Sequence, residues 1–445
     1  MHILSENALG GILADDMGLG KTIQMLAVFS IFTSMKDKPK IPSLVVAPKS
    51  LVFNWRNEFE KFTPKLKVLT YFGNDRKEQI KEFSKYDVLL TTYHTLRNDI
   101  ESLKDVPFYF YILDEAQNIK NPRSQLTLST KLIKSEKKFA LTGTPIENSI
   151  GDLVSILSVV NPGLITESLG QKMLKLTEPD DLKRFSKALA PFILRRTKEQ
   201  VLKDLPSKTE QVLYCELSDE ERAKYNEIKN YYWQKLNNKI KDNGIKNSKI
   251  EILGALLRLR QISCHMGLVD KSKLGEPSAK FDLLVDQIQT LINEGHMALV
   301  FSSFTSLLKI LSQQLREKNI QFEYLDGQTK DRAERVNNFQ TNEQISLFLL
   351  SLKAGGVGLN LTSADYVFII DPWWNPAAES QAIDRCYRIG QTKSVFAYKL
   401  IAKNTVEEKI LKLQERKKIL AENIINSDAN ILKELSMDDL SDLFS

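Results

Sequence analysis

The strongest constraint on the fold is an alternation of short apolar runs with charged, helix-forming stretches, which occurs twice along the chain. In the first half, the apolar runs SLVVAP, KVLTYF, YDVLLTTY and FYFYILDEAQ lie within residues 43–117. In the second half, MALVFSSF, FEYLDG, ISLFLLSL and DYVFIID lie within residues 297–371. Parallel strands joined by crossover helices produce this pattern. We therefore predict an α/β protein with two parallel-sheet domains.

Length and composition agree with two packed domains. The chain has 445 residues, and domains of roughly 100 to 200 residues would make two or three of it. Hydrophobic residues make up 42% and charged residues 27%, which is typical of globular proteins and excludes a largely disordered chain. The three cysteines form no C-x-x-C pair, so neither a disulfide framework nor a zinc knuckle is predicted.

Targeting signals are not evident in the sequence. No stretch approaches the roughly 20 apolar residues that span a bilayer, and the first fourteen residues contain no basic leader. We therefore expect neither export nor a membrane partner. The expected location is the cytoplasm, with association with the nucleoid in a bacterium, or the nucleus in a eukaryote.

The region between the two alternating halves has a different sequence pattern. Residues 151–290 contain few strand signals and several long amphipathic patterns, which predicts helical protrusions and a linker. After Asn404 the pattern predicts one charged helix and then an acidic tail. Residues 172–260 carry 20 Lys and Arg against 13 Asp and Glu, a net charge of +7. This excess fits a surface for a polyanion, but composition alone favours solvated, lysine-rich helices. The expected domains are 1–150, 151–290, 291–403 and 404–445.

The stretch ADDMGLGKT, residues 14–22, follows the phosphate-loop pattern G-x-x-x-x-G-K-[ST], except that Asp15 stands where the first glycine is usual. In such a loop, glycines let the backbone approach phosphate oxygens, the lysine reaches the outer phosphates, and the hydroxyl binds magnesium. A strand-like GILA precedes the stretch and an apolar helix pattern follows it. The predicted nucleotide-binding residues here are Asp15, Gly18, Leu19, Gly20, Lys21 and Thr22.

A second element for ATP hydrolysis follows about 90 residues later, in ILDEAQ. Hydrolysis needs a carboxylate at the end of a strand to hold Mg²⁺ and another group to orient the attacking water. We predict that Asp114 and Thr22 hold the metal, that Glu115 activates water, and that Lys21 contributes to catalysis. An isolated Asp-Glu pair would be weak support, but its combination with the loop is specific.

Longer strings resemble a known family. The segments DMGLGKT, DEAQ and LTGTPIEN, followed by LSLKAGGVGLNLTSAD and DPWWNPAAESQAIDRCYRIGQ, resemble the Swi/Snf-type family of superfamily-two DNA-dependent ATPases, which includes chromatin remodellers and bacterial relatives. The resemblance covers nearly the whole chain. It implies two RecA-like domains of the P-loop NTPase fold with helical insertions and a C-terminal brace helix. One Mg²⁺-bound ATP would be shared between the domains, with double-stranded DNA lying across both.

The resemblance also implies roles for particular residues. Pro376 suits a helix start and Gly390 its end, so Gln381, Arg385 and Arg388 are expected to share one helical face, with the two arginines stabilising charge on the transferring phosphoryl group. Gly358 and Gln381 are expected at the nucleotide. Residues expected to contact DNA are Lys49, Thr91, Thr92, Ser302, Gly355 and Gly356. Residues expected to couple the two sites are Gln117, Thr142, Gly143 and Thr144.

The expected function is an ATP-driven, monomeric translocase on double-stranded DNA that remodels DNA-bound protein complexes. Its grip on DNA is expected to be phosphate-based and independent of sequence. One alternative is a strand-separating or RNA-directed helicase, and another is an ATP-regulated clamp or a remodeller of transcribing RNA polymerase. Only fourteen residues precede Asp15, whereas the family carries upstream helices and an adenine-reading glutamine motif. We therefore expect the motor part of a longer protein.

Overall fold

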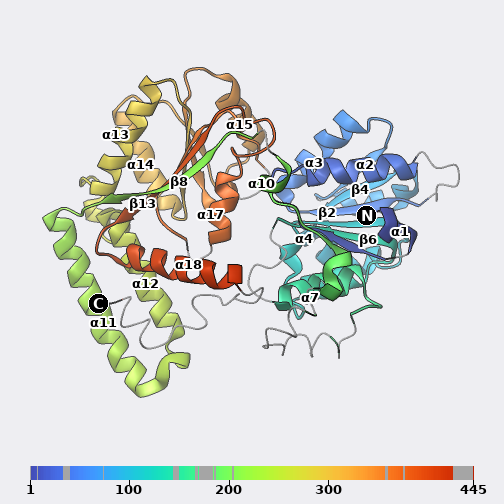
Figure 1. Cartoon of the computed structure of the whole chain (residues 1–445), viewed down its shortest axis with the longest axis horizontal. Coiled ribbons are helices and arrows are strands. Elements are labelled where there is room, and N and C mark those ends of the chain that lie inside the picture. Colours follow the sequence, from blue (N-terminus) through green and yellow to red (C-terminus); the bar gives the residue numbers. More distant parts are fainter. Residues whose placement is uncertain are drawn as a thin grey trace. The chain divides into compact units, whose positions relative to one another are not determined.

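The chain forms two compact units, of which the first comprises mainly residues 1–204 and the second mainly residues 205–420. The computed structural model of the chain is shown in Figure 1. It describes residues 2–7, 9–33, 41–73, 75–143, 150–165, 169, 184, 187–202, 205–355, 359–373, 376–423 and 444.

Within the described residues, the first unit contains a seven-stranded sheet in the order β3-β4-β2-β5-β6-β1-β7, with every neighbouring pair parallel. The strands are β1 (Gly11–Leu13), β2 (Ser43–Ala47), β3 (Val68–Tyr71), β4 (Val88–Thr92), β5 (Phe108–Asp114), β6 (Ser135–Leu141) and β7 (Ile193–Leu194). The central strand β5 is almost continuously apolar because a parallel sheet with helices on both faces buries both sides of its strands.

Helices cover both faces of this first sheet. On one face, Phe29 of α2 packs against Phe59 of α3 and Phe110 of β5, with ring centroids 5.6 and 5.3 Å apart. Helices α4 and α7 pack on the other face (Figure 1). The helices are α1 (His2–Glu6), α2 (Lys21–Thr33), α3 (Lys49–Phe62), α4 (Tyr93–Asn98), α5 (Ile100–Leu103), α6 (Gln125–Lys131), α7 (Ile150–Val160) and α10 (Lys198–Val201), with 3-10 turns η1 (Asp75–Lys85), η2 (Ala116–Ile119) and η3 (Ala190–Phe192).

The second unit is built around a six-stranded parallel sheet in the order β10-β11-β9-β12-β13-β8, again counted over the described residues. Its strands are β8 (Lys208–Cys215), β9 (Ala298–Ser302), β10 (Glu323–Leu325), β11 (Leu347–Ser351), β12 (Tyr366–Ile369) and β13 (Val395–Ala402). In β9, Ala298 and Val300 point into one hydrophobic cluster, whereas Leu299 and Phe301 point into another. This alternation follows from the two-residue period of a strand and shows that both faces are covered.

The helices of the second unit divide between those two faces. Helices α13 and α14 pack on one face of the sheet, and α15 and α17 pack on the other. The helices are α11 (Asp219–Asn247), α12 (Lys249–Cys264), α13 (Ala279–Asn293), α14 (Thr305–Glu317), α15 (Arg332–Thr341), α16 (Leu352–Gly355), α17 (Pro376–Ile383) and α18 (Val406–Asn423), with 3-10 turns η4 (Met266–Leu268) and η5 (Lys271–Lys273).

Helices α11 and α12 form a long hairpin that extends from the second sheet (Figure 1). Its base packs in a hydrophobic cluster with Val406 and Ile410 of α18. The start of α18 is also held by a fully buried ion pair, in which Lys280 Nζ lies 2.6 Å from Glu407 Oε2. The helix expected after Asn404 is therefore fixed to the second unit.

The predicted two-sheet α/β architecture is confirmed, and each apolar run quoted above contains a strand. Residues 151–290, predicted to form helical protrusions and a linker, also contain two strands, because β7 joins the first sheet and β8 pairs with β13 along its whole length. The expected boundaries at 150, 290 and 403 stay predictions. Within the described residues, no helix combines the length and the apolar character needed to cross a membrane.

Candidate nucleotide-binding site

The predicted phosphate loop connects β1 to α2, the arrangement that its sequence requires. Gly18 and Gly20 have φ angles of 87° and 73°, a left-handed conformation that side chains with a Cβ rarely adopt. Helix α2 begins at Lys21, so its first backbone N–H groups, which have no partner within the helix, border the loop. The loop therefore has the backbone geometry of an anion-binding site at a helix start.

Lys21 closes the loop on itself. Its Nζ donates to the backbone carbonyl of Asp15 at 2.7 Å and to that of Asp16 at 3.3 Å. The LTGTP segment passes close by, since a Cβ added to Gly143 would lie 2.7 Å from Met17 Cγ and 3.7 Å from Lys21 Nζ. A side chain at position 143 would therefore require Met17 to move, and the two predicted motifs approach each other here.

Asp114 is the last residue of β5, and its side chain is buried. Trp55 Nε1 donates to Asp114 Oδ2 at 2.7 Å, and the backbone N–H of Glu115 donates to Oδ1 at 2.9 Å. Burial and the neighbouring Glu115 carboxylate raise the pKa of Asp114 from 3.8 to about 7, while the bond from Trp55 and the charge of Lys21 oppose the rise. A nearby cation would stabilise the ionised form of such a buried carboxylate.

A chain of side-chain hydrogen bonds leads from Glu115 to the LTGTP segment. Gln117 Nε2 donates to Glu115 Oε2 at 2.8 Å, and Thr142 Oγ1 donates to Gln117 Oε1 at 2.9 Å. Glu115 itself has a left-handed backbone, with φ 49° and ψ 56°. The structure thus brings together Glu115, Gln117 and Thr142, which the motifs predicted as hydrolytic and coupling residues.

The carboxylate of Asp15 is held by neighbouring side chains of the first unit. It is completely buried and accepts hydrogen bonds from Arg196 and from Gln24. Its side chain is thus engaged within the first unit, and its expected part in nucleotide binding stays a prediction.

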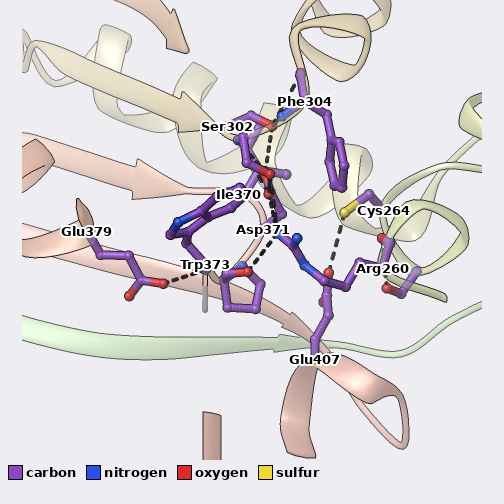
Figure 2. A network of polar contacts seen from close by, with 12 residues as sticks. Arg260, Cys264, Ser302, Phe304, Ile370, Asp371, Trp373, Glu379 and Glu407 are labelled. Atoms are coloured by element: carbon purple, nitrogen blue, oxygen red, sulfur yellow. Dashed lines mark hydrogen bonds and ion pairs between the residues drawn. The ribbon is translucent and has the colours of Figure 1, made fainter. Parts of the chain in front are cut away.

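In the second unit, a dense polar network surrounds Asp371, which follows β12 (Figure 2). Asp371 accepts from Ser302 Oγ at 2.5 Å, from the backbone N–H of Ser303 at 3.0 Å and from Arg260 Nη2 at 2.9 Å. The guanidinium of Arg260 also lies 5.1 Å from the Phe304 ring centroid and 5.3 Å from that of Trp373. This network ties the base of α12 to the ends of β9 and β12.

The same network reaches helices α17 and α18. The backbone N–H of Trp373 donates to Glu379 Oε1 at 2.7 Å, as Figure 2 shows, and Lys399 Nζ lies 2.7 Å from Glu379 Oε2. Gln414 of α18 donates to the carbonyl of Trp373. The side chain of Trp373 is partly buried and packs against the hydrophobic cluster that contains Leu299 and Phe301.

The helix expected to carry the two arginines is shorter than predicted. It begins at Pro376 as expected but ends at Ile383, because the chain then changes to three-residue turns, with the N–H of Arg385 donating to Ala382 O. Arg385 and Arg388 therefore lie beyond the helix and do not share a helical face with Gln381. Ile383 and Cys386 are buried in the core of the second unit.

Both arginines nevertheless contact the same neighbouring segment. The carbonyl of Arg385 accepts from the N–H of Leu361 at 3.0 Å, and Arg388 Nη1 donates to Leu359 O at 3.4 Å. Arg385 is 5% exposed. Their predicted role in phosphoryl transfer stays a prediction.

Three residues expected to contact DNA have hydroxyls that are engaged inside the protein. Thr91 Oγ1 donates to Tyr71 O at 2.7 Å, Thr92 caps α4 by accepting from the N–H of Thr95 at 3.1 Å, and Ser302 binds Asp371. All three side chains are buried, and the expectation that these residues contact DNA stays a prediction. Small hydroxyl residues at strand ends are used here to fix the following turns.

The other residues expected to contact DNA lie partly within and partly outside the described residues. Lys49 is exposed at the start of α3 and remains a candidate for phosphate contact. Gly355 is the last residue of α16. Thr144, Gly356 and Gly358 lie outside the described residues.

Several residues of the site were not anticipated from the sequence. Trp55 and Tyr93 both bind Asp114, the latter through a hydrogen bond to its carbonyl at 2.8 Å. Arg196 and Arg260 lie in the region read as helical linker. Of these residues, only Asp371 could have been found from the sequence, because it follows an apolar strand pattern, as Asp114 does.

Comparison with known proteins identifies the chain. The family model of the SNF2-related domain matches residues 1–268. The family model of the helicase conserved C-terminal domain matches residues 279–390. The chain belongs to the SNF2-related family. The resemblance predicted from its motifs is confirmed, and SNF2-related membership assigns the two sheets to RecA-like lobes and the chain to the ATP-dependent enzymes.

SNF2-related relatives extend beyond this chain. An uncharacterised ATP-dependent helicase of Mycoplasma genitalium is 37% identical over 100% of the chain and 43% of its own length. The putative ATP-dependent helicase/translocase YwqA of Bacillus subtilis is 36% identical over 99% of the chain and 49% of its own length. The solved SWI2/SNF2 ATPase core of Sulfolobus solfataricus in complex with dsDNA is 37% identical over 100% of this chain and 94% of that chain, with a TM-score of 0.47. The chain thus spans less than half of the first two relatives.

SNF2-related proteins use ATP, and the residues present fit its usual metal. Mg²⁺ prefers oxygen ligands and is commonly held by one or two protein groups together with the phosphates of the nucleotide. The hydroxyl of Thr22 and the carboxylate of Asp114 are such groups. The described residues contain no cluster of three or more His, Cys, Asp or Glu side chains that could hold a metal without phosphates.

Proposed function

We propose that this chain is the motor region of an ATP-driven translocase that moves along double-stranded DNA. The observation that carries the proposal is the hydrogen-bonded path from Glu115 through Gln117 to Thr142. It gives a change at a bound nucleotide a direct route to the LTGTP segment, which is what a motor needs and a passive clamp does not. Membership of the SNF2-related family supports the same function.

At the nucleotide, the proposal gives each candidate residue a task. Lys21 would bind the outer phosphates, Thr22 and Asp114 would hold Mg²⁺, and Glu115 would orient the attacking water. Mg²⁺ would neutralise charge on the phosphates during transfer. Arg385 and Arg388 of the second unit would stabilise the same developing charge.

On DNA, the proposed grip relies on the phosphate backbone. Lys49 is exposed at the start of α3, and cations of this kind release counterions from DNA when they bind it. The affinity should therefore fall steeply with salt and depend little on base sequence. We further propose that movement along DNA displaces or repositions bound proteins, supported by the likeness of the motif strings to those of chromatin remodellers.

The test is ATP turnover by the purified chain without nucleic acid and with single-stranded DNA, RNA or linear duplex DNA of increasing length. We expect strong stimulation by duplex DNA that rises with its length. Lys21→Ala should abolish turnover, whereas Lys131→Ala, a matched change of an exposed lysine on α6, should not. Normal turnover by Lys21→Ala would refute the assignment of the phosphate loop.

Two other outcomes would favour the alternatives. Efficient displacement of one strand from a forked duplex would indicate a strand-separating helicase, a reading suggested by the names of the Mycoplasma and Bacillus relatives. Equal turnover under all four conditions would contradict coupling to duplex DNA and would favour a motor that acts on a protein complex such as transcribing RNA polymerase.

A further inference from the structure

The phosphate loop begins with two acidic residues, whose negative charge opposes the binding of phosphate. Asp15 and Asp16 are adjacent carboxylates at the start of a loop that is proposed to bind a polyanion. Asp15 replaces the usual first glycine of the pattern and is completely buried. An ionised, uncompensated carboxylate at this position would repel phosphate groups through a medium of low dielectric constant.

Arg196 lies against the carboxylate of Asp15 from a segment 181 residues away in sequence. Its Nη2 donates to Asp15 Oδ2 at 2.5 Å, its Nε donates to Oδ1 at 3.1 Å, and its backbone N–H donates to Oδ1 at 3.0 Å. This forked contact is the geometry in which guanidinium and carboxylate groups bind most specifically. The contact with Asp15 also raises the pKa of Arg196, so the arginine stays charged.

A third side chain completes the contact from helix α2. Gln24 Nε2 donates to Asp15 Oδ2 at 3.2 Å and to the carbonyl of Leu19 at 3.1 Å, and Gln24 Oε1 accepts from Arg196 Nη2 at 2.7 Å. Because Leu19 belongs to the loop itself, the Arg196 contact extends through Gln24 to the part of the loop between its two glycines.

Backbone pairing delivers Arg196 to this position. Strand β7 pairs with β1, and the pairing continues along the loop, since Ala14 N–H donates to Leu194 O at 2.7 Å and Asp16 N–H donates to Arg196 O at 3.0 Å. The second carboxylate is also engaged, because Asp16 Oδ2 accepts from the backbone N–H of Lys198 at 3.0 Å. Both acidic side chains are thus held by the segment after β7.

We propose that Arg196 is a positioning residue of the nucleotide loop, which neutralises Asp15 and holds the loop open for phosphate. The inference rests on the proposed function, since it concerns the same nucleotide. It gives the segment after β7, which the motifs had marked only as a linker, a direct part in nucleotide affinity. Replacing Asp15 by an uncharged residue should then make Arg196 dispensable for binding.

The test measures the Kd of a fluorescent ATP analogue, together with KM and kcat for ATP, on the full chain. Arg196→Ala should weaken analogue binding and raise KM by roughly 10- to 100-fold, as expected for an uncompensated charge near phosphates. Arg195→Ala, a change of the adjacent exposed arginine, is the matched control and should leave binding unchanged. The double variant Asp15→Asn/Arg196→Ala should recover most of the lost affinity.

Each outcome decides the inference. Wild-type affinity in Arg196→Ala would overturn it, and so would a loss that Asp15→Asn does not relieve, because that pattern indicates a purely structural contact. If Arg196→Ala does not fold, as monitored by thermal unfolding, Asp15→Asn alone should bind the analogue at least as tightly as the wild type, and weaker binding would contradict the proposal. Failure of the wild type itself to bind the analogue would instead refute the proposed function.

Discussion

Asp114 and Asp371 make an instructive pair, because each is a buried carboxylate at the end of a central strand of a parallel sheet. Asp114 accepts hydrogen bonds from two neutral donors, Trp55 and the N–H of Glu115, and lies beside a second carboxylate. Asp371 accepts from the guanidinium of Arg260 and from two serines. The two positions are equivalent in topology and opposite in electrostatics.

The difference shows which buried carboxylate is available for chemistry. The charge of Asp371 is balanced inside the protein, so this residue stabilises a junction of helices and strands. The charge of Asp114 is poorly balanced, which is why its pKa is raised to about 7. A divalent cation would supply the missing positive charge. Topology alone would have assigned both residues the same role.

The largest expected effect is on catalysis by Asp114→Asn. Loss of the metal-binding charge should lower ATP turnover by about 1000-fold, because a metal supplies several kcal/mol of transition-state stabilisation. Ligand-free stability should not fall, and above pH 7 it should rise, because asparagine removes the cost of the buried charge. The measurement is steady-state turnover with saturating duplex DNA, and normal turnover in this variant would remove the distinction between the two carboxylates.

Asp371→Ala should act on stability instead. It leaves Arg260 buried with its charge uncompensated, and breaking a buried pair in this way costs about 3 to 5 kcal/mol. Denaturant unfolding should show the loss in the transition of the second unit. The double variant Asp371→Ala/Arg260→Met removes the stranded charge and should recover part of the stability; no recovery would show that the pair is not the source of the loss.

The third effect is a pH dependence of metal binding. Because the pKa of Asp114 is raised to about 7, Mg²⁺-nucleotide must displace a proton below that pH, and its affinity should fall up to about tenfold per pH unit there. The folded chain also holds this proton more tightly than the unfolded chain, so ligand-free stability falls as pH rises toward 7. Calorimetry in buffers of different ionisation enthalpy measures the released proton. Equal release by Asp114→Asn would assign the proton to another group.

The smallest effect is expected from Ser303→Ala. Ser303 is one of several donors to Asp371, and its backbone N–H remains in the variant, so the loss of free energy of unfolding should be about 1 kcal/mol. ATP turnover should stay at the wild-type level, measured beside Asp114→Asn. A large loss of turnover would mean that the Asp371 network also acts on the nucleotide.

Local patterns in the sequence predicted most of the fold. The apolar runs predicted the central strands, and the two glycines with the lysine predicted a loop whose positive φ angles are found at Gly18 and Gly20. Strands β6 and β8 were not named, because SEKKFAL and KTEQVLYC mix charged residues with apolar ones. Edge and amphipathic strands of this kind carry a weak periodic signal.

What the sequence did not predict depends on contacts between distant residues. The helix after Pro376 ends early because the segment that follows it turns to bond with Leu361, an interaction that helical spacing does not reveal. The burial of Thr91 and Ser302 depends on neighbouring strands. The partner of Asp15, Arg196, follows the two-residue strand β7, which no local pattern in the sequence predicts.

The all-parallel pairing of both sheets has a consequence for synthesis of the protein. A ribosome extends the chain from its N-terminus at about 5 to 20 residues per second. The first sheet can close once β7 emerges, because β7 pairs with β1 at its edge. Strand β8 is made next but pairs with β13, in the register that sets Lys208 opposite Val395, and so it waits roughly 10 to 40 seconds at that rate. During this interval, β8 presents a strand edge that a chaperone would have to shield.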